Sequence, residues 1–473
     1  MQFAADLGSA PSAYEPSPRW VDRPQPGSLA SAAGLSELSH IPGRAGLPLV
    51  GIMPEAMLNP LRWTEQMYER FGPVHRFYAC GSWNVQLIGP EANELVLFDR
   101  QNLFSAEGGW HRLIGGLFPG ALLLKDGADH RASRRILGEA FKPARVEAYQ
   151  RIFANDIERA VESWQGKSID IYAEARRLTL SIAVSTFLGL PDDIRAPSIV
   201  RALADMVDGV LATFQSPWLS PTYARAVRGK RRLEALIAEL IRDRRRAPGE
   251  DIFSRICLLR DDEGALLSEH EIQGVTIFLL SAAQDTLSSA LTSTADYLAR
   301  YPIWAERLRS EAEDARIDDI ASVSEVALPF HDMVFKEALR LNAPAPVVWR
   351  RARQPFSIYG FDIPANAMVA VNPLLTHRLE SIWPEPDRFN PMRFTAAAEA
   401  RRHRFAYVPF GGGVHKCLGM HFAQQQARIF MVALLRRSTL APANAMPVAW
   451  THWPNAKPRA PLAISVTERI PGR

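Results

Sequence analysis

The longest stretch of helical periodicity runs from Ser268 to about Tyr301, and apolar residues fall on every face of it. A helix that is apolar all round is buried on all sides, so we expect this segment to pass through the middle of a domain. Ser268 and Glu271 have the spacing of a capping box, which marks the start. Pro302 follows Tyr301 and marks the end. The pattern therefore predicts a central helix of about thirty residues.

Shorter helical and strand patterns surround this segment. Helical periodicity is found in 61–71, 129–141, 328–341 and after Cys417, and most of 146–246 is helical with breaks expected at Pro191, Pro197, Pro217 and Pro221. Alternating patterns predict a short hairpin of strands at 74–78 and 84–89, further strands at 356–364 and 367–371, and a terminal hairpin across 447–466 that turns near Trp453. The sequence therefore predicts a mainly α fold with small β-sheets.

The two ends of the chain differ in composition. Residues 1–40 are rich in Pro, Ser, Ala and Gly and lack periodicity, so we expect a flexible N-terminal arm there. Residues 41–473 are predicted to form a single domain, entered through the turn-rich segment 41–51. The segment 102–124 has glycines, aromatic and aliphatic residues and almost no charge, which predicts a buried loop.

Composition and charge narrow the class of protein. The 473 residues are 47% hydrophobic and 22% charged with a net charge of +4, which is ordinary for a protein with a large core and gives no sign of nucleic-acid binding. No apolar run approaches the ~18 residues of a membrane span, and the first residues do not resemble a signal peptide. Cys80, Cys257 and Cys417 are too widely spaced for a disulfide framework or a zinc cluster. We therefore expect a soluble, cytoplasmic protein without a transmembrane anchor.

The segment from Phe410 to Phe422 places one cysteine, Cys417, after a glycine run and before a helical pattern. Glycine lets the backbone turn tightly and approach another group closely. A cysteine at a helix start lies near unpaired N–H groups and the positive end of the helix dipole, which favour the thiolate. Haem iron is one metal that accepts a single protein sulfur. The alternative is a buried structural cysteine after a turn.

The spacing of Phe410, Gly413, Cys417 and Gly419 resembles the Phe-x-x-Gly-x-x-x-Cys-x-Gly loop of the cytochrome P-450 family. The resemblance extends from about residue 41 to the C-terminus and implies the cytochrome P-450 fold, with the long central helix over the haem. It implies haem b as the cofactor and Cys417 as the ligand of its iron. The further cofactor-binding residues that it implies in this loop are Phe410, Gly411 and Gly419.

In the long helix, Ala282, Asp285 and Thr286 match the oxygen-activating motif of the family. A buried carboxylate is costly unless it is paired or used, and Thr286 can bond back to the carbonyl of Ala282. The resemblance implies that Asp285 and Thr286 relay protons and that Ala282 lies against the haem. Leu287 stands where the family more commonly has Thr or Ser, which leaves the pair intact. A polar kink without catalytic meaning is the alternative.

Basic residues from three segments match positions that hold the haem propionates in the family. His130 and Arg134 lie one turn apart on a predicted helix, Arg350 precedes a predicted strand, and His415 lies two residues before the cysteine. Arg351 is an adjacent rival for the role of Arg350. For the helix pair, a solvated basic face is the alternative interpretation.

Glu337 and Arg340 lie three residues apart on one face of a predicted helix. That spacing alone is common on surface helices, but Pro386-Asp-Arg388-Phe389 follows later in the chain. The family joins such a Glu and Arg to the Arg of a Pro-x-Arg-Phe motif. The resemblance therefore implies a buried structural triad of Glu337, Arg340 and Arg388 behind the cysteine loop.

The resemblance also implies where substrate and electron donor bind. The segment 102–124 matches the variable loop over the substrate pocket, and the turn near Trp453 reaches back to that pocket. The pocket residues expected on this basis are Trp110, Leu113, Phe278, Val347 and Val348. Electrons are expected from a separate ferredoxin or flavodoxin with an NAD(P)H-dependent reductase, on a basic patch of Lys416, Arg131, Arg135, Arg401, Arg402 and Arg404.

The sequence is thus interpreted as a haem-thiolate monooxygenase, expected to be a monomer, that inserts one oxygen atom of O2 into a lipophilic small molecule. Pro409–Gly413 and Thr286–Leu287 look like the branch with retinoid and sterol oxidases, which favours a terpenoid, steroid, retinoid or fatty acid. One alternative is a peroxide-driven peroxygenase or an isomerising haem-thiolate enzyme, which usually lacks the Asp/Thr pair. The other is a haem-binding sensor or carrier without turnover.

Overall fold

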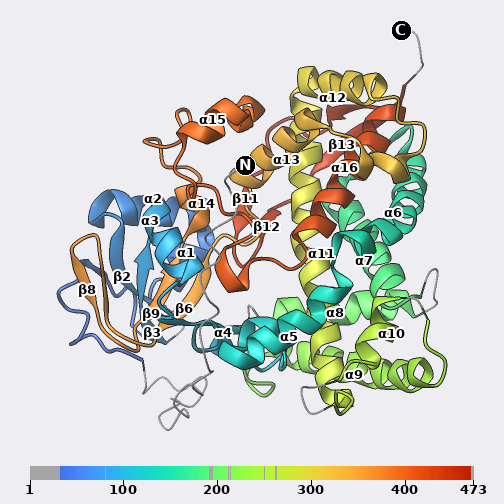
Figure 1. Cartoon of the computed structure of the whole chain (residues 1–473). Helices are drawn as coiled ribbons and strands as arrows, with labels where there is room; N and C mark the ends of the chain where they lie inside the picture. The colour runs from blue at the N-terminus through green and yellow to red at the C-terminus, as the bar shows by residue number, and fades with distance from the viewer. Residues whose placement is uncertain are drawn as a thin grey trace, which may run out of the picture.

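The computed structural model describes residues 32–48, 50–79, 81–190, 195–210, 212, 215–249, 251–260 and 264–469. Helices make up most of the described chain, and a smaller β-rich part lies beside them (Figure 1). The predicted mainly α fold with small β-sheets is therefore confirmed.

The helices follow the periodic segments of the sequence. They are α1 Met53–Leu58, α2 Pro60–Phe71, α3 Pro90–Asn93, α4 Ala106–Ile114, α5 Gly127–Ala140, α6 Pro143–Trp164, α7 Ile171–Phe187, α8 Ala196–Val210, α9 Pro221–Arg246, α10 Ile252–Cys257, α11 Glu269–Arg300, α12 Pro302–Asp314, α13 Pro329–Leu341, α14 Pro373–Thr376, α15 Ala396–Arg401 and α16 Met420–Arg437. Among the described helices, none has the length and apolar character that crossing a membrane requires.

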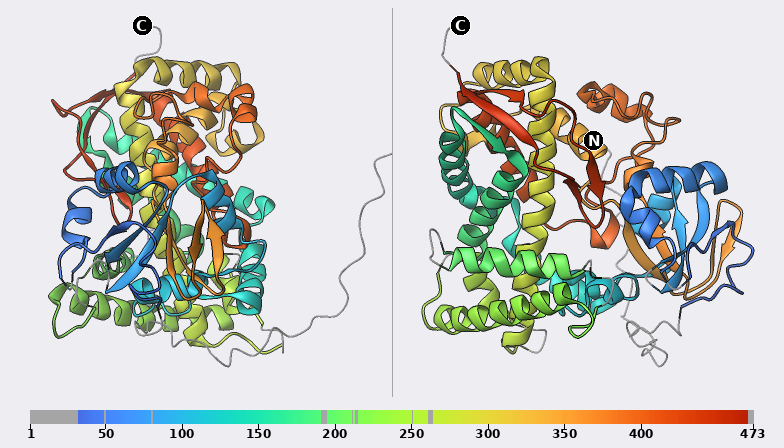
Figure 2. Two further views of the ribbon diagram at one scale, coloured as in Figure 1. Left: turned by 90° about the vertical axis from the view of Figure 1, so that its left-hand side faces the viewer. Right: turned by 180° about the vertical axis from the view of Figure 1, so that it is seen from behind.

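Helix α11 runs the length of the helical part, as both turned views in Figure 2 show. The side chain of Ser268 accepts a hydrogen bond from the N–H of Glu271, and the Glu271 carboxylate accepts one from the N–H of Ser268, so the predicted capping box is present. Helices α7, α9, α13 and α16 pack against α11. Its side chains enter the largest apolar cluster, and Leu280, Leu291 and Leu298 are fully buried. The prediction of a buried central helix is confirmed.

The strands of the described residues are short and form four sheets. They are β1 Gly43–Arg44, β2 Val74–Ala79, β3 Ser82–Leu87, β4 Phe104–Ser105, β5 Lys167–Asp170, β6 Val348–Ala352, β7 Phe356–Ile358, β8 Phe361–Ile363, β9 Met368–Val371, β10 Ser438–Pro442, β11 Trp450–His452, β12 Ala456–Pro458 and β13 Ala463–Glu468. The largest sheet has the order β1-β2-β3-β9-β6-β4. The predicted β2–β3 hairpin is confirmed, with Val74 opposite Leu87. Strand β6 pairs antiparallel with β9, which places Arg350 opposite Val369.

The segment 102–124, predicted as a loop, contains helix α4. The side chain of Ser105 caps this helix by accepting a hydrogen bond from the N–H of Gly108 at 2.8 Å. A Cβ on Gly109 would lie 2.6 Å from the backbone nitrogen of Arg350. The glycines that made the segment look like a loop are therefore what lets α4 lie directly on β6.

One further prediction about local structure is confirmed and one needs correction. Pro197 is the second residue of α8, so a helix begins there as the expected break requires, because a proline in the first turn lacks only an N–H that has no partner within the helix. The terminal hairpin is confined to β11 and β12, while β13 pairs with β10 and β5. Pro221 begins α9, so the break expected there is confirmed, whereas Pro191 lies outside the described residues.

The last part of the expected N-terminal arm, residues 32–40, lies in the described part of the chain. Residues 1–31 and Cys80 lie outside the described part of the chain. Leu38 and Ile41 are fully buried, and Ala33 is nearly so, in the apolar cluster of the β-rich part. Because these side chains remove apolar surface from water, residues 32–40 pack as part of the folded chain.

Candidate functional site

The cysteine loop leads into α16, and its glycines pack closely on a neighbouring segment. Gly411 and Gly413 have φ angles of 67° and 59°, in the left-handed region that favours glycine. A Cβ on Gly413 would lie 2.5 Å from the carbonyl oxygen of Leu97. The N–H of Cys417 donates to the carbonyl of Phe410 at 2.9 Å and closes the loop. The backbone therefore fixes the position of Cys417 just before the helix begins.

The side chain of Cys417 is accessible to solvent, yet burial raises the pKa of its thiol. Solvent therefore reaches Cys417 although many protein atoms surround it, and we call the solvent-accessible space beside its thiol the hollow. The N–H of Gly419 and the charges of Arg134 and Lys416 oppose the rise in pKa. The N–H of Gly419 at the helix start thus favours the thiolate as predicted, but burial outweighs this effect in the chain alone. A metal ion bound by Cys417 would supply the positive charge that a thiolate needs.

Gly419 lies beside open space. Apart from its two chain neighbours, no described residue has an atom within 4 Å of the position that its Cβ would take, and its φ of −86° is one that any residue adopts. Neither crowding nor backbone strain within the chain thus requires glycine here. A flat group bound in the hollow gives a reason for it, so this position fits the cofactor that the sequence predicts.

A cluster of basic side chains faces the same region. The ring centroids of His130 and His415 lie 3.9 Å apart. Burial and nearby positive charges, that of Arg350 foremost, lower the pKa of His415 to about 2. Burial and the charge of Arg134 lower the pKa of His130 to about 4, and its Nε2 is buried without a partner among the described residues. Asp126 supplies one carboxylate, 4.0 Å from His415. This excess of positive charge fits a ligand that carries carboxylates.

Neighbouring residues of a strand point to opposite faces, and this separates Arg350 from Arg351 in β6. The charge of Arg350 acts on His415, and burial lowers the pKa of Arg350 to about 10. The side chain of Arg351 instead lies under α4, where a Cβ on Gly108 would meet it at 2.9 Å. Arg350 is therefore the arginine of the pair that belongs to the basic cluster.

Thr286 lies in the middle of α11 with the contact that the sequence predicts. Its Oγ1 donates to the carbonyl oxygen of Ala282 at 2.7 Å. Leu287, the departure from the family pattern, points into the apolar core and is 5% exposed. The change at this position therefore affects packing and leaves the hydroxyl of Thr286 in place.

Asp285 is 9% exposed, and the turn between β11 and β12 reaches it. The Nδ2 of Asn455 lies 3.5 Å from an Oδ of Asp285. Burial raises the pKa of Asp285, while the charges of Arg176 and Lys457 oppose the rise. A carboxyl group whose pKa lies closer to neutral can both hold and release a proton. Asp285 and Thr286 together thus have the chemistry of a proton relay.

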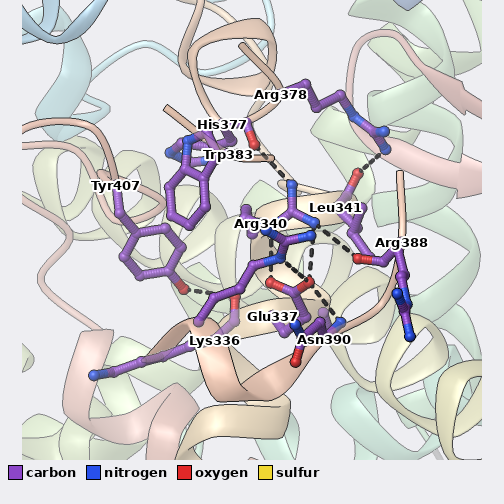
Figure 3. Close-up of polar contacts among 12 residues, drawn as sticks. Lys336, Glu337, Arg340, Leu341, His377, Arg378, Trp383, Arg388, Asn390 and Tyr407 are labelled. Carbon is purple, nitrogen blue, oxygen red and sulfur yellow. Dashed lines mark hydrogen bonds and ion pairs between the residues drawn. The ribbon is translucent and has the colours of Figure 1, made fainter. Parts of the chain in front are cut away.

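Glu337 and Arg340 form a fully buried ion pair on α13 (Figure 3). Two nitrogens of Arg340 donate to the two carboxylate oxygens at 2.7 and 2.9 Å. Arg340 also donates to the carbonyl of His377 at 2.8 Å, and the N–H of Asn390 donates to Glu337 at 2.9 Å. The Nε2 of His377 accepts the N–H of Val408, which lies just before the cysteine loop. The pair therefore supports the approach to Cys417.

The prediction that Arg388 is the third member of this triad is wrong. Its side chain is 65% exposed, pairs with Glu385 at 3.2 Å and points away from Arg340 in Figure 3. Only its carbonyl accepts from Arg340, at 3.4 Å. Arg393 takes the place instead, with its Nε 3.4 Å from Glu337 and its side chain 9% exposed. The signal was present in the sequence, because Pro391-Met-Arg393-Phe394 is a second Pro-x-Arg-Phe five positions later.

The expected pocket residues are not all in one place. Trp110, Leu113 and Val347 pack against a small apolar cluster formed by α2 and the largest sheet. Phe278 packs against the large helical cluster, with its ring centroid 6.4 Å from that of Phe118. Trp110 and Leu113 also contact the large cluster and so bridge the two. Val348 begins β6 and is half-buried.

An apolar pocket lies beside that small cluster, and sequence reasoning missed most of its lining. Trp63, His452 and Trp453 line it together with Val347. The sequence around Trp63 predicts only a helix, and the sequence around His452 predicts only a hairpin. Neither pattern indicates that these two segments, far apart in the sequence, line the same pocket.

Comparison with known proteins agrees with this arrangement. The family model described as cytochrome P450 matches residues 41–453. The putative cytochrome P450 136 of Mycobacterium tuberculosis (strain ATCC 25618 / H37Rv) is 32% identical over 430 residues, 87% of this chain and 85% of that relative. The putative cytochrome P450 120 of Synechocystis sp. is 28% identical over 449 residues, 93% and 99% of the two chains. The solved structure of retinoic acid bound cyanobacterial CYP120A1 matches with a TM-score of 0.84 at 26% identity, covering 90% of this chain and 99% of that one.

The two arginines of the Pro-x-Arg-Phe motifs make a matched pair for mutation. Arg393→Ala removes a buried partner of Glu337 and is expected to lower the free energy of unfolding by about 1–3 kcal/mol. Arg388→Ala removes an exposed ion pair and is expected to cost less than about 0.5 kcal/mol. Denaturant unfolding of the two variants measures both values. Equal losses, or a larger loss for Arg388→Ala, would show that Arg388 is the structural residue after all.

Proposed function

This chain belongs to the cytochrome P450 family, and on that premise we propose that it inserts one oxygen atom of O2 into a lipophilic small molecule as a haem-thiolate monooxygenase. The observation that carries the proposal is the hollow walled by Cys417, with the basic cluster at its edge and with Asp285 and Thr286 on the central helix. Each of these is a separate requirement of oxygen activation, and they come from different segments of the chain.

Members of the family bind haem through a cysteine thiolate, and the residues here fit that group. When bound, haem b supplies the cleavage of the O–O bond, which a thiolate ligand favours. In our proposal Cys417 is the iron ligand, and Phe410, Gly411 and Gly419 shape the loop around it. The side chains proposed to hold the propionates are His130, Arg134, Arg350 and His415. Burial lowers the pKa values of all four side chains, nearby positive charges lower those of the two histidines further, and carboxylates bound there would offset both effects.

The proton relay is proposed to begin at the carboxyl group of Asp285. Lys457 and Arg176 lie near enough to oppose the burial-induced rise in its pKa, and the Nδ2 of Asn455 contacts one of its oxygens. A proton held on Asp285 passes along α11 toward the hydroxyl of Thr286. The bond from Thr286 to the carbonyl of Ala282 orients that hydroxyl. The role of these residues is to hold and move the proton while the apolar walls exclude bulk water.

Electrons are proposed to come from a separate ferredoxin or flavodoxin with an NAD(P)H-dependent reductase. A basic surface suits an acidic partner because opposite charges steer the encounter. Arg402, one residue expected in this patch, is half-buried with its guanidinium 3.8 Å above the ring of Trp383, so we remove it from the docking surface. The exposed basic residues that remain are Arg131, Arg135, Arg401, Arg404 and Lys416.

The carboxyl group of Asp285 and the hydroxyl group of Thr286 on α11 favour the monooxygenase over its alternatives. A peroxide-driven enzyme receives oxygen that is already reduced and has less need of a relay. A sensor or carrier without turnover has no use for a buried carboxyl group beside a hydroxyl, which costs stability. The buried position of Asp285 is therefore the observation that argues against both.

Replacement of the proposed iron ligand gives the most direct test. Purified protein with haem, reduced and exposed to carbon monoxide, is expected to show the red-shifted Soret band of thiolate ligation. Cys417→Ser is expected to abolish this band because the sulfur is lost. Cys257→Ser, which changes a buried cysteine in α10, serves as the control and is expected to keep it. A band unaffected by Cys417→Ser would reject the assignment.

The relay can be tested by the yield of product per electron consumed. Thr286→Ala is expected to lower this coupling by about tenfold or more, because the hydroxyl that passes the proton is gone. Thr292→Ala is the matched control, since Thr292 also lies on α11 and bonds back to the carbonyl four residues earlier at 2.6 Å. Coupling that falls equally in both variants would indicate a general effect on the helix.

The pH dependence of coupling tests the role of Asp285. Lys457→Met removes a positive charge that lowers the pKa of this carboxyl group, so that pKa should rise further. The pH at which coupling is half-maximal is therefore expected to move upward, while Lys457→Arg keeps the charge and the profile. A profile that does not move in Lys457→Met, or that moves downward, would speak against proton transfer through Asp285.

A further inference from the structure

Helix α9 lies at the edge of the helical part, near the bottom of Figure 1, and its arginines divide between two faces. One face is apolar and buried in the protein. Near the end of the helix, Arg244 donates to the carbonyl of Leu188 at 3.0 Å. Arg245 donates to the carbonyl of Leu267 at 2.6 Å. These two arginines therefore hold α9 to the rest of the fold.

Five other arginines of α9 form an exposed stripe on the opposite face. On a helix of 3.6 residues per turn they fall within about 100° of one another and extend over roughly 27 Å of the axis. The members of this arginine stripe are Arg228, Arg231, Arg232, Arg242 and Arg246. None of them forms an ion pair or a side-chain hydrogen bond with a described residue. Two exposed acids, Glu239 and Asp243, lie beside them, so an excess of three positive charges faces solvent.

The turn before α9 exposes two apolar side chains. Trp218 is 94% exposed, more than any other large apolar residue in the described part of the chain, and Leu219 is 68% exposed. The N–H of Leu219 donates to the carbonyl of Ser216 at 3.1 Å. The side chain of Ser220 caps α9 by accepting from the N–H of Tyr223 at 3.2 Å. Hydrogen bonds thus hold a turn that projects an indole ring into solvent at the start of α9.

The chemistry of this surface fits a membrane that contains anionic lipids. Arginines near such a membrane are attracted by its negatively charged headgroups. Tryptophan is enriched at the boundary between lipid and water, because its ring is apolar and its N–H is polar. A protein partner favours an apolar centre with few charges, surrounded by a polar rim. Here the apolar pair lies at one end and the charges extend along the helix, which favours the lipid surface.

We propose that Trp218, Leu219 and the arginine stripe form a peripheral binding surface for a bilayer that contains anionic phospholipids. The stripe lies against the headgroups, and the two apolar side chains enter the edge of the lipid layer. The apolar face of α9 stays packed on the protein, so binding requires no unfolding. The attraction between exposed charges makes the binding reversible and sensitive to salt.

This surface adjoins the segment expected to cover the substrate pocket. In the chain between α8 and α9, the Nε2 of Gln215 donates to the carbonyl of Leu113 in α4 at 2.9 Å. A lipophilic substrate dissolves in the same bilayer, so membrane binding would bring α4 close to its source. This consequence rests on the proposed function, whereas the binding surface itself does not.

Sedimentation with lipid vesicles tests the proposal on the protein with haem bound. Vesicles of phosphatidylcholine with phosphatidylglycerol are compared with vesicles of phosphatidylcholine alone. Binding to the anionic vesicles is expected to be at least about tenfold tighter and to weaken in high salt, because salt screens exposed charges. Equal binding to the two kinds of vesicle, or no binding to either, would overturn the proposal.

A pair of double variants locates the charge effect. Arg228→Gln with Arg232→Gln removes two charges of the stripe and is expected to weaken binding to anionic vesicles about tenfold to thirtyfold. Arg62→Gln with Arg70→Gln is the matched control, because it removes two exposed arginines from α2, which lies in the β-rich part away from α9 in Figure 1. An equal loss in both would show that only the net charge matters and would reject the stripe.

The apolar contribution is tested in the same way. Trp218→Ser is expected to weaken vesicle binding about tenfold. Ile303→Ser is the control, since Ile303 is 75% exposed on α12, at the opposite end of Figure 1 from α9, and this variant is expected to bind as before. Both side chains are exposed, so the unfolding midpoint should stay unchanged in each variant. Full vesicle binding by Trp218→Ser would overturn the proposal.

A nucleic acid is the other polyanion that arginines attract. Double-stranded DNA that bound more tightly than the anionic vesicles, with no loss in Trp218→Ser, would assign the surface to nucleic acid and reject the lipid. Sedimentation requires no turnover, so a failure to bind vesicles leaves the carbon monoxide spectrum and the effect of Cys417→Ser as they are. The proposed reaction and the membrane surface can therefore fail independently.

Discussion

The buried ion pair between Glu337 and Arg340 constrains the rest of this molecule. Both side chains are fully buried, and a charge in such a place is tolerated only with partners on every side. Those partners are the side chain of Arg393 and backbone groups of distant segments, at His377, Arg388 and Asn390. The pair therefore specifies where these segments lie, and His377 extends the connection to Val408 before the cysteine loop. The position of Cys417 depends on charges that take no part in the chemistry.

The hollow shows a second kind of constraint, because several ionisable groups around it lack the partners of opposite charge that would stabilise their ionised forms. The Cys417 thiol has a raised pKa, and the histidines of the basic cluster have lowered ones. Each shift has burial as its largest cause, and each is of the kind that a bound ion or carboxylate reverses. The protein thus holds a set of groups in an arrangement that costs stability and that a cofactor of complementary charge relieves.

The sequence predicted what short-range patterns determine. The capping box at Ser268, the β2–β3 hairpin and the bond from Thr286 to Ala282 all depend on residues close together in the chain. Predictions failed where distant packing decides. The segment of α4 has a loop-like composition because its glycines allow close contact with β6. The prediction of Arg388 failed because two motifs share the pattern Pro-x-Arg-Phe, and only packing decides that the arginine of the second one, Arg393, reaches Glu337. The pocket at Trp63 and His452 was missed for the same reason.

The apolar pocket joins the two ends of the described chain. Helix α1 provides one wall and the β11–β12 hairpin another, and Arg459 of the last segment donates to the carbonyl of Leu58, 401 residues earlier. Contacts over such separations form late in folding, because a long loop must close first. On the ribosome, the helices around α11 emerge and can pack before the hairpin has been synthesised. The apolar pocket is therefore completed only after the β11–β12 hairpin has been synthesised, so a chain truncated before this hairpin lacks the pocket even if its helical part has folded.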